Sequence, residues 1–128
     1  MVQTKIYGLR ERLEPIKNQL SEVINSCVVE ALVYPPEKRC HRFFMMDKTD
    51  FFYPEGRTDR YTIVEFSMIE GRTIAAKKQL IRLMFDRAQT LGISTQDLEM
   101  TIFENPKHNW GFRGLPGDEH NLNYKVEV

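Results

Sequence analysis

Residues 20–32 read LSEVINSCVVEAL, and residues 77–89, 57 positions further along the chain, read KKQLIRLMFDRAQ. Apolar side chains recur in both stretches at the spacings i, i+3, i+4 and i+7, the pattern of a helix with one buried face. At the same offset two flanking pairs of strand-like runs also coincide, namely residues 4–6 with 61–63 and 42–46 with 99–103. We therefore predict that a strand–helix–strand unit occurs twice in this chain.

The first unit is predicted to contain a strand over residues 2–8, a helix that starts near Leu13, and a strand over residues 39–46. Pro15 fixes the helix start, because proline is tolerated only in the first turn of a helix. Pro35-Pro36 ends this helix, because the residue before a proline is pushed out of helical space.

The second unit is predicted to contain a strand over 61–69, a helix over about 74–91 and a strand over 98–103. Thr73 is the expected N-cap of this helix, and Gly92 is expected to end it. Residues 47–60 are polar and carry glycine and proline, which predicts a loop. Within that loop, residues 51–53 are interpreted as either a short extra strand or a lid.

The whole chain, residues 1–128, is predicted to form a single domain of the α+β class. Its pseudo-repeats would span about 2–46 and 61–104, and residues 105–128 would form a C-terminal hairpin or arm. Two right-handed β-α-β units give a four-stranded mixed sheet with both helices on one face.

The other face of that sheet is predicted to be uncovered and to carry large apolar groups. A monomer rarely exposes so much apolar surface, and we therefore infer self-association through the sheet. The alternative is a ferredoxin-like monomer with a partly solvated sheet.

Composition excludes several classes of function. Lysine plus arginine and aspartate plus glutamate number 18 each, so net charge gives no argument for binding nucleic acid or a membrane surface. No apolar run approaches the roughly 20 residues of a membrane helix. Cys27 and Cys40 do not make a disulfide framework, and a cytoplasmic location is expected.

Arg72 is a candidate anion-binding residue. It lies between a predicted strand and a predicted helix, beside free backbone N–H groups and the positive end of the helix. A carboxylate or phosphate would be bound well there. The alternative is a solvated turn in which Thr73 caps the helix and Arg72 pairs with a surface acid.

Trp110 and Phe112 are candidate pocket residues. They stand two positions apart, so in an extended segment both side chains point the same way. They could enclose an apolar pocket, or they could pack into a neighbouring subunit. The histidines and cysteines show no metal-ligand spacing, and neither a metal nor a cofactor is expected.

With the duplicated unit, Arg72 and the Trp110-Gly111-Phe112 run in hand, the chain resembles the tautomerase superfamily, and within it the malonate semialdehyde decarboxylase-like branch. The likeness covers nearly the whole length. Its most specific pieces are the run Glu-Asn-x₄-Trp-x-Phe at 104–112, the arginine after the third strand, and Pro36-x-x-Arg39. The resemblance implies a homotrimer of β-α-β protomers with active sites near subunit boundaries.

The family's site consists of an amino-terminal proline, substrate-binding arginines, an acid after the first helix and an aromatic wall. The resemblance places Arg72 at one arginine and Glu70 where the other would be. It places Lys38 at the acid position, with Glu37 beside it as a substitute. Trp110 and Phe112 match the aromatic wall, and small 2-oxo or 3-oxo acids are the implied substrates.

Position 2 is Val2, where the family has its proline. Removal of Met1 would leave a primary amine on Val2, with an ordinary pKa of about 7.7–8.0 that an apolar pocket would lower. Protonated, this amine could donate a proton to an enol carbon; neutral, it could form a Schiff base with an oxo acid. If Met1 remains, the amine is displaced by one residue.

Weak isomerase or lyase activity, of the tautomerase or decarboxylase kind, is therefore expected, with Val2, Arg72 and Glu37 as candidate catalytic residues. Arg72, Trp110 and Phe112 are the candidate substrate-binding residues. Two alternatives stay open on the same scaffold. One is a non-catalytic protein that binds a small carboxylate, and the other is a purely structural trimer.

Overall fold

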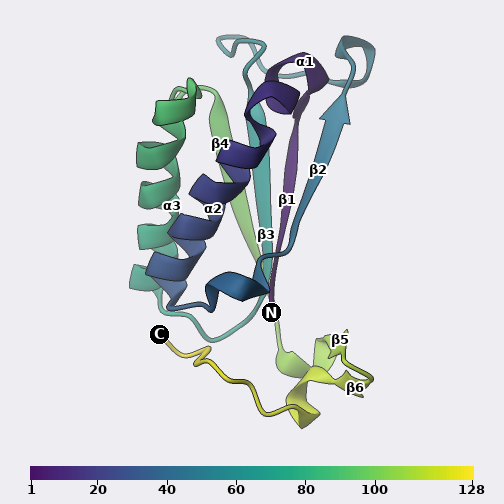
Figure 1. Ribbon diagram of the computed structural model, residues 1–128, viewed down its shortest axis with the longest axis vertical. Coiled ribbons are helices and arrows are strands. Elements are labelled where there is room, and N and C mark those ends of the chain that lie inside the picture. The colour runs from purple at the N-terminus through teal and green to yellow at the C-terminus, as the bar shows by residue number, and fades with distance from the viewer.

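Two helices lie side by side on one face of a four-stranded mixed sheet in the computed structural model, which describes residues 1–128 (Figure 1). The strands of this sheet are β1 (Val2–Leu9), β2 (His41–Met46), β3 (Thr62–Ile69) and β4 (Leu98–Asn105). The first helix consists of α1 (Arg10–Leu13) and α2 (Lys17–Leu32), and the second is α3 (Ile74–Ala88). The predicted fold class, α+β with a duplicated β-α-β unit, is confirmed.

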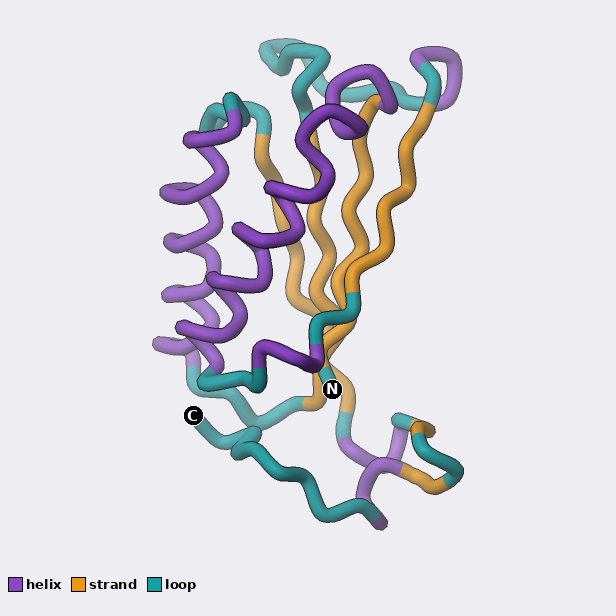
Figure 2. The backbone as a smooth tube through the Cα atoms, in the orientation of Figure 1, coloured by secondary structure: helices purple, strands orange, loops and turns teal.

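The sheet has the strand order β2-β1-β3-β4. Each outer strand runs parallel to its inner neighbour, so α2 crosses from β1 to β2 and α3 crosses from β3 to β4. The two inner strands are antiparallel, with Val2 opposite Met68 and Ile6 opposite Val64. This pairing brings the beginning of β1 to the end of β3 (Figure 2).

The first helix begins earlier than predicted and is interrupted. It starts at Arg10, and a 3₁₀ turn at Glu14–Ile16 separates α1 from α2. Pro15 lies in this turn, where its missing N–H and its ring would disrupt a regular α-helix. At its other end α2 stops at Val33, which takes a left-handed conformation with φ of 49°, ahead of the predicted stop at Pro35.

The two units match, but not at one constant offset. The strands β1 and β3 show the same alternation of burial, which pairs Val2 with Thr62 and Ile6 with Phe66, an offset of 60. A shift by an odd number of residues turns a strand side chain to the other face. The offset of 57 is therefore wrong for the first strands, because it equates buried Ile6 with the outward-facing Ile63.

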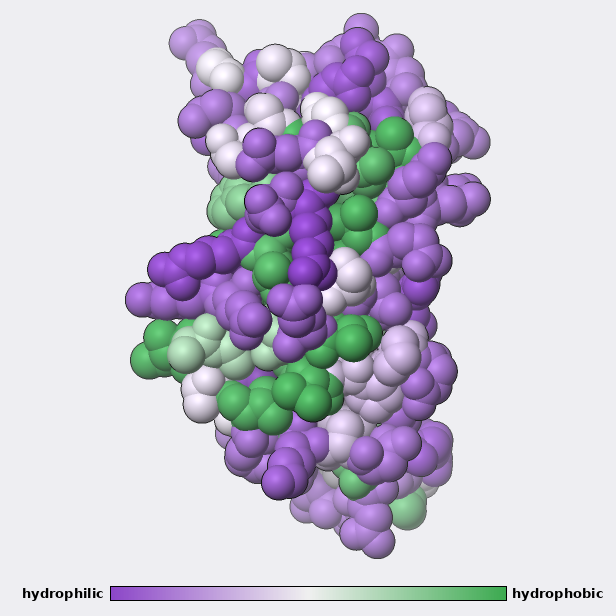
Figure 3. All heavy atoms as spheres, turned by 60° about the vertical axis from the view of Figure 1, so that its left-hand side comes forward, coloured by the Kyte–Doolittle hydropathy of each residue, from purple (hydrophilic) through white to green (hydrophobic).

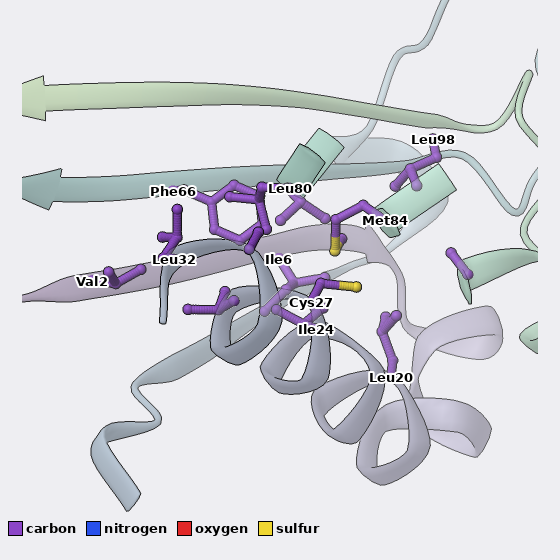
Figure 4. Close-up of a cluster of buried hydrophobic side chains, with 14 of the residues drawn as sticks. Val2, Ile6, Leu20, Ile24, Cys27, Leu32, Phe66, Leu80, Met84 and Leu98 are labelled. Atoms are coloured by element: carbon purple, nitrogen blue, oxygen red, sulfur yellow. The ribbon is translucent and has the colours of Figure 1, made fainter. Parts of the chain in front are cut away.

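The hydrophobic core fills the space between the sheet and the helices (Figure 4). Burial of one large apolar side chain contributes on the order of 1.5–3 kcal/mol to folding. Cys27 belongs to this core, as a small apolar side chain with a free thiol. The labelled members are Val2, Ile6, Leu20, Ile24, Cys27, Leu32, Phe66, Leu80, Met84 and Leu98.

Figure 3 shows the side of the molecule on which α3 lies. This surface is mostly hydrophilic, with hydrophobic groups in patches between the polar ones. Val33 and Ile74 are the most exposed aliphatic side chains of this helical layer. No helix combines the length and the apolarity that crossing a membrane requires.

The uncovered face of the sheet is polar at its centre, where the sequence predicts large apolar groups. Lys5 lies opposite Glu65 there, and Ser67 follows on the same face of β3. Exposed apolar side chains stand on the outer strands instead, with Phe44 40% exposed on β2 and Phe103 46% exposed on β4. This face is therefore less apolar than alternation alone predicts.

The loop over residues 47–60 contains a 3₁₀ turn at Lys48–Asp50 and no additional strand. Three aromatic rings hold it against the sheet, because Phe51, Tyr53 and Tyr61 have centroids 5.5–5.8 Å apart. Phe52 points outward and is 92% exposed. The extra strand considered for residues 51–53 is thus not formed.

The core packing predicts unequal costs for two truncations on the same helix. Leu80→Ala should lower the free energy of unfolding by about 2–5 kcal/mol, because Leu80 is fully buried. Ile74→Ala should change it by less than about 0.5 kcal/mol, because Ile74 is 69% exposed. Urea unfolding followed by circular dichroism measures both, and equal losses would contradict the packing of α3 described above.

Candidate functional site

The start of the chain is held inside the fold rather than free in solvent. The Met1 amine donates a hydrogen bond to the hydroxyl of Tyr124, and the Val2 backbone N–H donates to the hydroxyl of Tyr34 at 3.2 Å. The Met1 carbonyl accepts a hydrogen bond of 3.3 Å from the backbone N–H of Ile69. These contacts fix the terminal nitrogen beside the end of β3.

Burial lowers the pKa of the Met1 amine from 8.0 to about 5. The positive charges of Arg72, Lys38 and Lys107 contribute to this lowering of the pKa. The amine is therefore neutral at pH 7, and its lone pair can accept a proton or attack a carbonyl carbon.

Arg72 lies in the turn between β3 and α3 and is only 5% exposed. Its Nη1 donates a hydrogen bond of 2.8 Å to the carbonyl of Ile69, whereas Nε and Nη2 are buried without a partner. Burial lowers the pKa of this guanidinium. No acid pairs with Arg72, so the surface ion pair considered as an alternative is not formed. Two unpaired nitrogens on a buried guanidinium are suited to a carboxylate.

The turn that carries Arg72 has a defined geometry. Thr73 caps α3 as predicted, because its hydroxyl accepts a hydrogen bond of 3.1 Å from the backbone N–H of Ala76. Gly71 has φ of 135°, a conformation that a residue with a side chain rarely adopts. The Thr73 N–H donates to the carbonyl of Val128 at 2.9 Å, which ties the turn to the other end of the chain.

Residues 121–128, which we call the C-terminal strap, run past this turn (Figure 1). Val126 is buried against Gly71, where a β-carbon would come within 2.9 Å of its Cγ1 atom. Tyr124 packs edge-on against Tyr34 at a centroid distance of 4.9 Å, and the Lys38 ammonium lies 5.8 Å from its ring. The strap therefore closes the site around the chain start.

Trp110 and Phe112 lie in a small hairpin that extends beyond the end of β4 (Figure 1). Its strands are β5 (Gly111–Phe112) and β6 (Leu115–Pro116). Phe112 stacks on His120 at 4.4 Å, and Trp110 packs against Gly117 with its indole N–H buried and unpaired. No hydrogen bond or aromatic contact links either ring to the chain start within one protomer.

Glu37 is exposed in the 3₁₀ turn Pro36–Lys38, and its side chain forms no hydrogen bond or ion pair. Lys38 faces the site instead, as its contact with Tyr124 shows. Of the predicted site residues, the structure thus brings Val2 and Arg72 together and leaves Glu37, Trp110 and Phe112 apart from them.

Sequence reasoning missed two residues of this site, Tyr34 and Tyr124. Tyr34 is 3% exposed and follows the end of α2. Its place between an apolar helix and Pro35 indicates burial, but gives no sign of contact with Val2. Tyr124 lies in a segment without regular periodicity, so no sequence signal links it to Met1.

A small cavity of about 10 Å³, with room for about one water molecule, lies at the chain start, and Val2, Tyr34 and Lys38 are among the residues that line it. A larger, open cleft of about 460 Å³ lies at the far end of β1, with Glu11 and Lys48 among its lining residues. The chain start is the better candidate for the site, because the charge of buried Arg72 acts on the terminal amine there and neither residue lines the larger cleft. No cluster of three or more histidine, cysteine, aspartate or glutamate side chains is present to hold a metal ion.

A duplicated β-α-β fold with a buried terminal amine beside a buried arginine is the arrangement expected of a tautomerase. A family model described as "Tautomerase enzyme" matches residues 38–113, which is more than half of the chain. The chain belongs to this family, as the sequence resemblance predicts.

Individual proteins agree with this assignment. A probable tautomerase of Ralstonia nicotianae is 36% identical over 55 residues, which are 42% of this chain and 79% of the relative. A malonate semialdehyde decarboxylase shares the fold with a TM-score of 0.77 at 17% identity, covering 86% of this chain and 89% of its own. A fused 4-OT structure has a TM-score of 0.80 at 17% identity, covering 91% of this chain and 96% of its own.

The turn geometry predicts a specific effect of adding one methyl group. Gly71→Ala should lower the free energy of unfolding by about 2–3 kcal/mol, because it combines positive φ with a contact of 2.9 Å to Val126. Gly56→Ala is the matched control, since Gly56 also has positive φ but has nothing within 4 Å of the added carbon.

The control should cost about 1–2 kcal/mol, the penalty of the backbone alone. Urea unfolding gives both values, and limited proteolysis should cleave the C-terminal strap faster in Gly71→Ala only. Equal stability losses with equal cleavage rates would show that the strap does not pack on this turn.

Proposed function

We propose that this protein is a tautomerase- or decarboxylase-like enzyme, an isomerase or lyase, that acts on a small 2-oxo or 3-oxo acid through its amino terminus. It works in the cytoplasm and as a homotrimer. The observation that carries the proposal is a neutral terminal amine close to a buried guanidinium with two unpaired nitrogens. Family membership supports the same class of chemistry.

Arg72 binds the carboxylate of the substrate through Nε and Nη2. Its third hydrogen-bonding group, Nη1, is held by the Ile69 carbonyl, so the guanidinium is fixed in place before the substrate arrives. A preorganised donor pair in a water-poor site stabilises an anion more than the same pair would in bulk water.

The terminal amine transfers the proton. As a neutral base it takes a proton from the carbon beside the oxo group, and the electron pair left behind forms an enolate. Arg72, Lys38 and Lys107 supply positive charge that stabilises this enolate. Returning the proton to a different atom completes a tautomerisation. With a 3-oxo acid, loss of CO₂ generates the enolate, and the amine then takes up a proton from water and passes it to the enolate carbon.

Val2 carries this amine when Met1 has been removed. Its nitrogen already donates to the Tyr34 hydroxyl, and its side chain is 3% exposed, so burial favours the neutral amine there as well. A chain that keeps Met1 offers the same chemistry one residue further out. Because a shift of roughly 1 Å costs about a hundredfold in rate, only one of the two chain starts will be efficient.

The aromatic residues complete the site in the trimer. The hairpin of Trp110 and Phe112 extends away from its own chain start, so in an assembly it can enclose the pocket of a neighbouring protomer (Figure 1). The fused 4-OT protein that shares this fold forms an asymmetric trimer, which supports a homotrimer here. Glu37, exposed in the protomer, is the candidate acid that such a neighbour would bury.

A second candidate is a protein that binds a small carboxylate without turnover. It is favoured by Val2 at the position of the family's proline and by Lys38 at the position of its acid. It needs only Arg72 and the surrounding cations, all of which the fold supplies. Tight binding of an oxo acid without conversion would establish this second candidate.

The proposal predicts a large loss of activity on changing Arg72. Arg72→Ala should lower kcat/KM for an aryl pyruvate by about 10–100-fold, because two charge-assisted hydrogen bonds to the carboxylate are removed. Arg72→Lys should recover only part of this, since an ammonium lacks the planar fork of donors. Arg82→Ala is the control, as Arg82 is exposed on α3. Native rates in Arg72→Ala would rule out the carboxylate role.

The proposal also predicts how activity depends on pH. In the chain that begins with Met1, kcat/KM for enol–keto exchange should rise with pH and level off above a midpoint near pH 5, where the amine loses its proton. Spectrophotometric assays of aryl pyruvate exchange measure this. Absence of any rate above buffer, both in the native chain and in Val2→Pro without Met1, would reject the enzymatic proposal.

A further inference from the structure

Two tyrosine hydroxyls bracket the first peptide unit of the chain. Tyr124 accepts a hydrogen bond from the Met1 amine, and Tyr34 accepts one of 3.2 Å from the Val2 nitrogen. The two rings pack edge to face, with centroids 4.9 Å apart and planes inclined by 71°. Each nitrogen that could be the chain terminus thus has its own phenol.

Tyr34 is fixed by the core. It is 3% exposed and belongs to the same hydrophobic cluster as Val2. It follows the left-handed cap of α2 at Val33 and precedes Pro35, which restricts the backbone on both sides. Its hydroxyl therefore cannot turn far from the Val2 nitrogen.

Tyr124 is fixed by the C-terminal strap. Val126 is buried against Gly71, and the Val128 carbonyl binds the Thr73 N–H, so Tyr124 stands just before two anchored positions. The Lys38 ammonium lies 5.8 Å from its ring, within the range of a cation–π contact. Tyr124 also lines an open groove of about 520 Å³ beside the end of α2, and its side chain is partly exposed there.

We propose that Tyr34 and Tyr124 position the terminal nitrogen, each for one of two chain starts: Tyr124 serves the chain that keeps Met1, and Tyr34 serves the chain that begins at Val2. The inference rests on the proposed function, in which that nitrogen moves the proton. Both tyrosines lie outside the residues 38–113 that match the family model. They act through the amine and are positioning residues in this role.

Removal of Met1 changes the hydrogen bonding of the Tyr124 hydroxyl. Its hydroxyl loses its amine partner, while the Val2 nitrogen stays on Tyr34. Burial raises the pKa of both tyrosines, so both hydroxyls keep their protons at neutral pH. The freed Tyr124 hydroxyl can then donate a hydrogen bond to the oxo or enol oxygen of an acid bound by Arg72.

Several charged and titratable groups act on the terminal nitrogen, and the test must allow for them. The cations are Arg72 from the turn before α3, Lys38 from the turn after α2, and Lys107 from the turn after β4. The phenols are Tyr34 and Tyr124. Glu104 and Glu127 act on Arg72, and Glu104 is paired with Lys77 at 2.8 Å. The three cations and the two glutamates remain in place in the variants used below.

The test compares two proteins, released from a cleavable fusion so that one begins with Met1 and the other with Val2. Each is made as native chain, Tyr34→Phe, Tyr124→Phe and Tyr61→Phe. The control residue, Tyr61, binds Glu99 through its hydroxyl at the opposite end of the sheet. Melting temperatures confirm that each variant folds.

The measurement is the pH dependence of labelling of the terminal amine by pyruvate and cyanoborohydride. The neutral amine adds to the oxo carbon, water leaves to give an imine, and hydride from the reagent with a proton from water gives a secondary amine. Peptide mass spectrometry quantifies the adduct, and lysine labelling in the same sample is the internal reference.

A crossed pattern is expected. In the Met1 protein, which should label with a midpoint near pH 5, Tyr124→Phe lowers the midpoint by roughly one unit, because the ammonium loses an acceptor. Tyr34→Phe leaves that midpoint unchanged. In the Val2 protein Tyr34→Phe lowers the midpoint and Tyr124→Phe leaves it unchanged. Tyr61→Phe changes the midpoint in neither protein.

Equal responses of both variants in both proteins, or no response in either, would overturn the inference. If Tyr34→Phe does not fold, Tyr124→Phe alone tests the inference. It must change the labelling midpoint of the Met1 protein and leave that of the Val2 protein unchanged. Aryl pyruvate turnover is measured in parallel. A crossed pattern without turnover rejects the proposed function and supports the positioning role of the two tyrosines. Turnover without a crossed pattern supports the proposed function and rejects that positioning role.

Discussion

The antiparallel pairing of β1 with β3 is the constraint on which the rest of the structure depends. It places Val2 opposite Met68, so the first residues of the chain lie beside the turn that follows β3. That turn carries Arg72 in a buried position. A parallel pairing of the same strands would put the two groups at opposite ends of the sheet. The candidate site is therefore a direct product of how the two halves of the chain pair.

Much of the fold could be predicted from sequence because its signals are local and periodic. The crossover helices, the N-cap at Thr73 and the placement of Arg72 in a strand-to-helix turn all follow from short stretches of sequence. The offset between the first strands of the two units could not be predicted from the helices, which align at 57 positions. The burial of β1 and β3 matches only at an even offset, because side chains alternate between the two faces of a strand. Only the sheet reveals which face Ile6 and Phe66 share.

Only part of the candidate site could be predicted, because some of its residues are far apart in the sequence. Arg72 and Val2 were found by their local setting and by the family resemblance. Tyr34 and Tyr124 are separated by 90 positions and meet only because the strap returns to the end of α2. Likewise, nothing in the sequence states which of Glu37 and Lys38 a 3₁₀ turn will direct inward. Contacts that depend on the path of an irregular tail have no periodicity to reveal them.

Val2 has two structural roles, and no substitution can change one of them without the other. Its side chain is part of the hydrophobic cluster, and its nitrogen stands on Tyr34. Any exchange at this position alters the filling of the protein interior together with the basicity and placement of the nitrogen. Laboratory evolution of a more active variant would therefore meet a trade-off at Val2. Selection for turnover alone would enrich chains that fold poorly, and compensating substitutions would be expected in Leu32 or Phe66, which share that cluster.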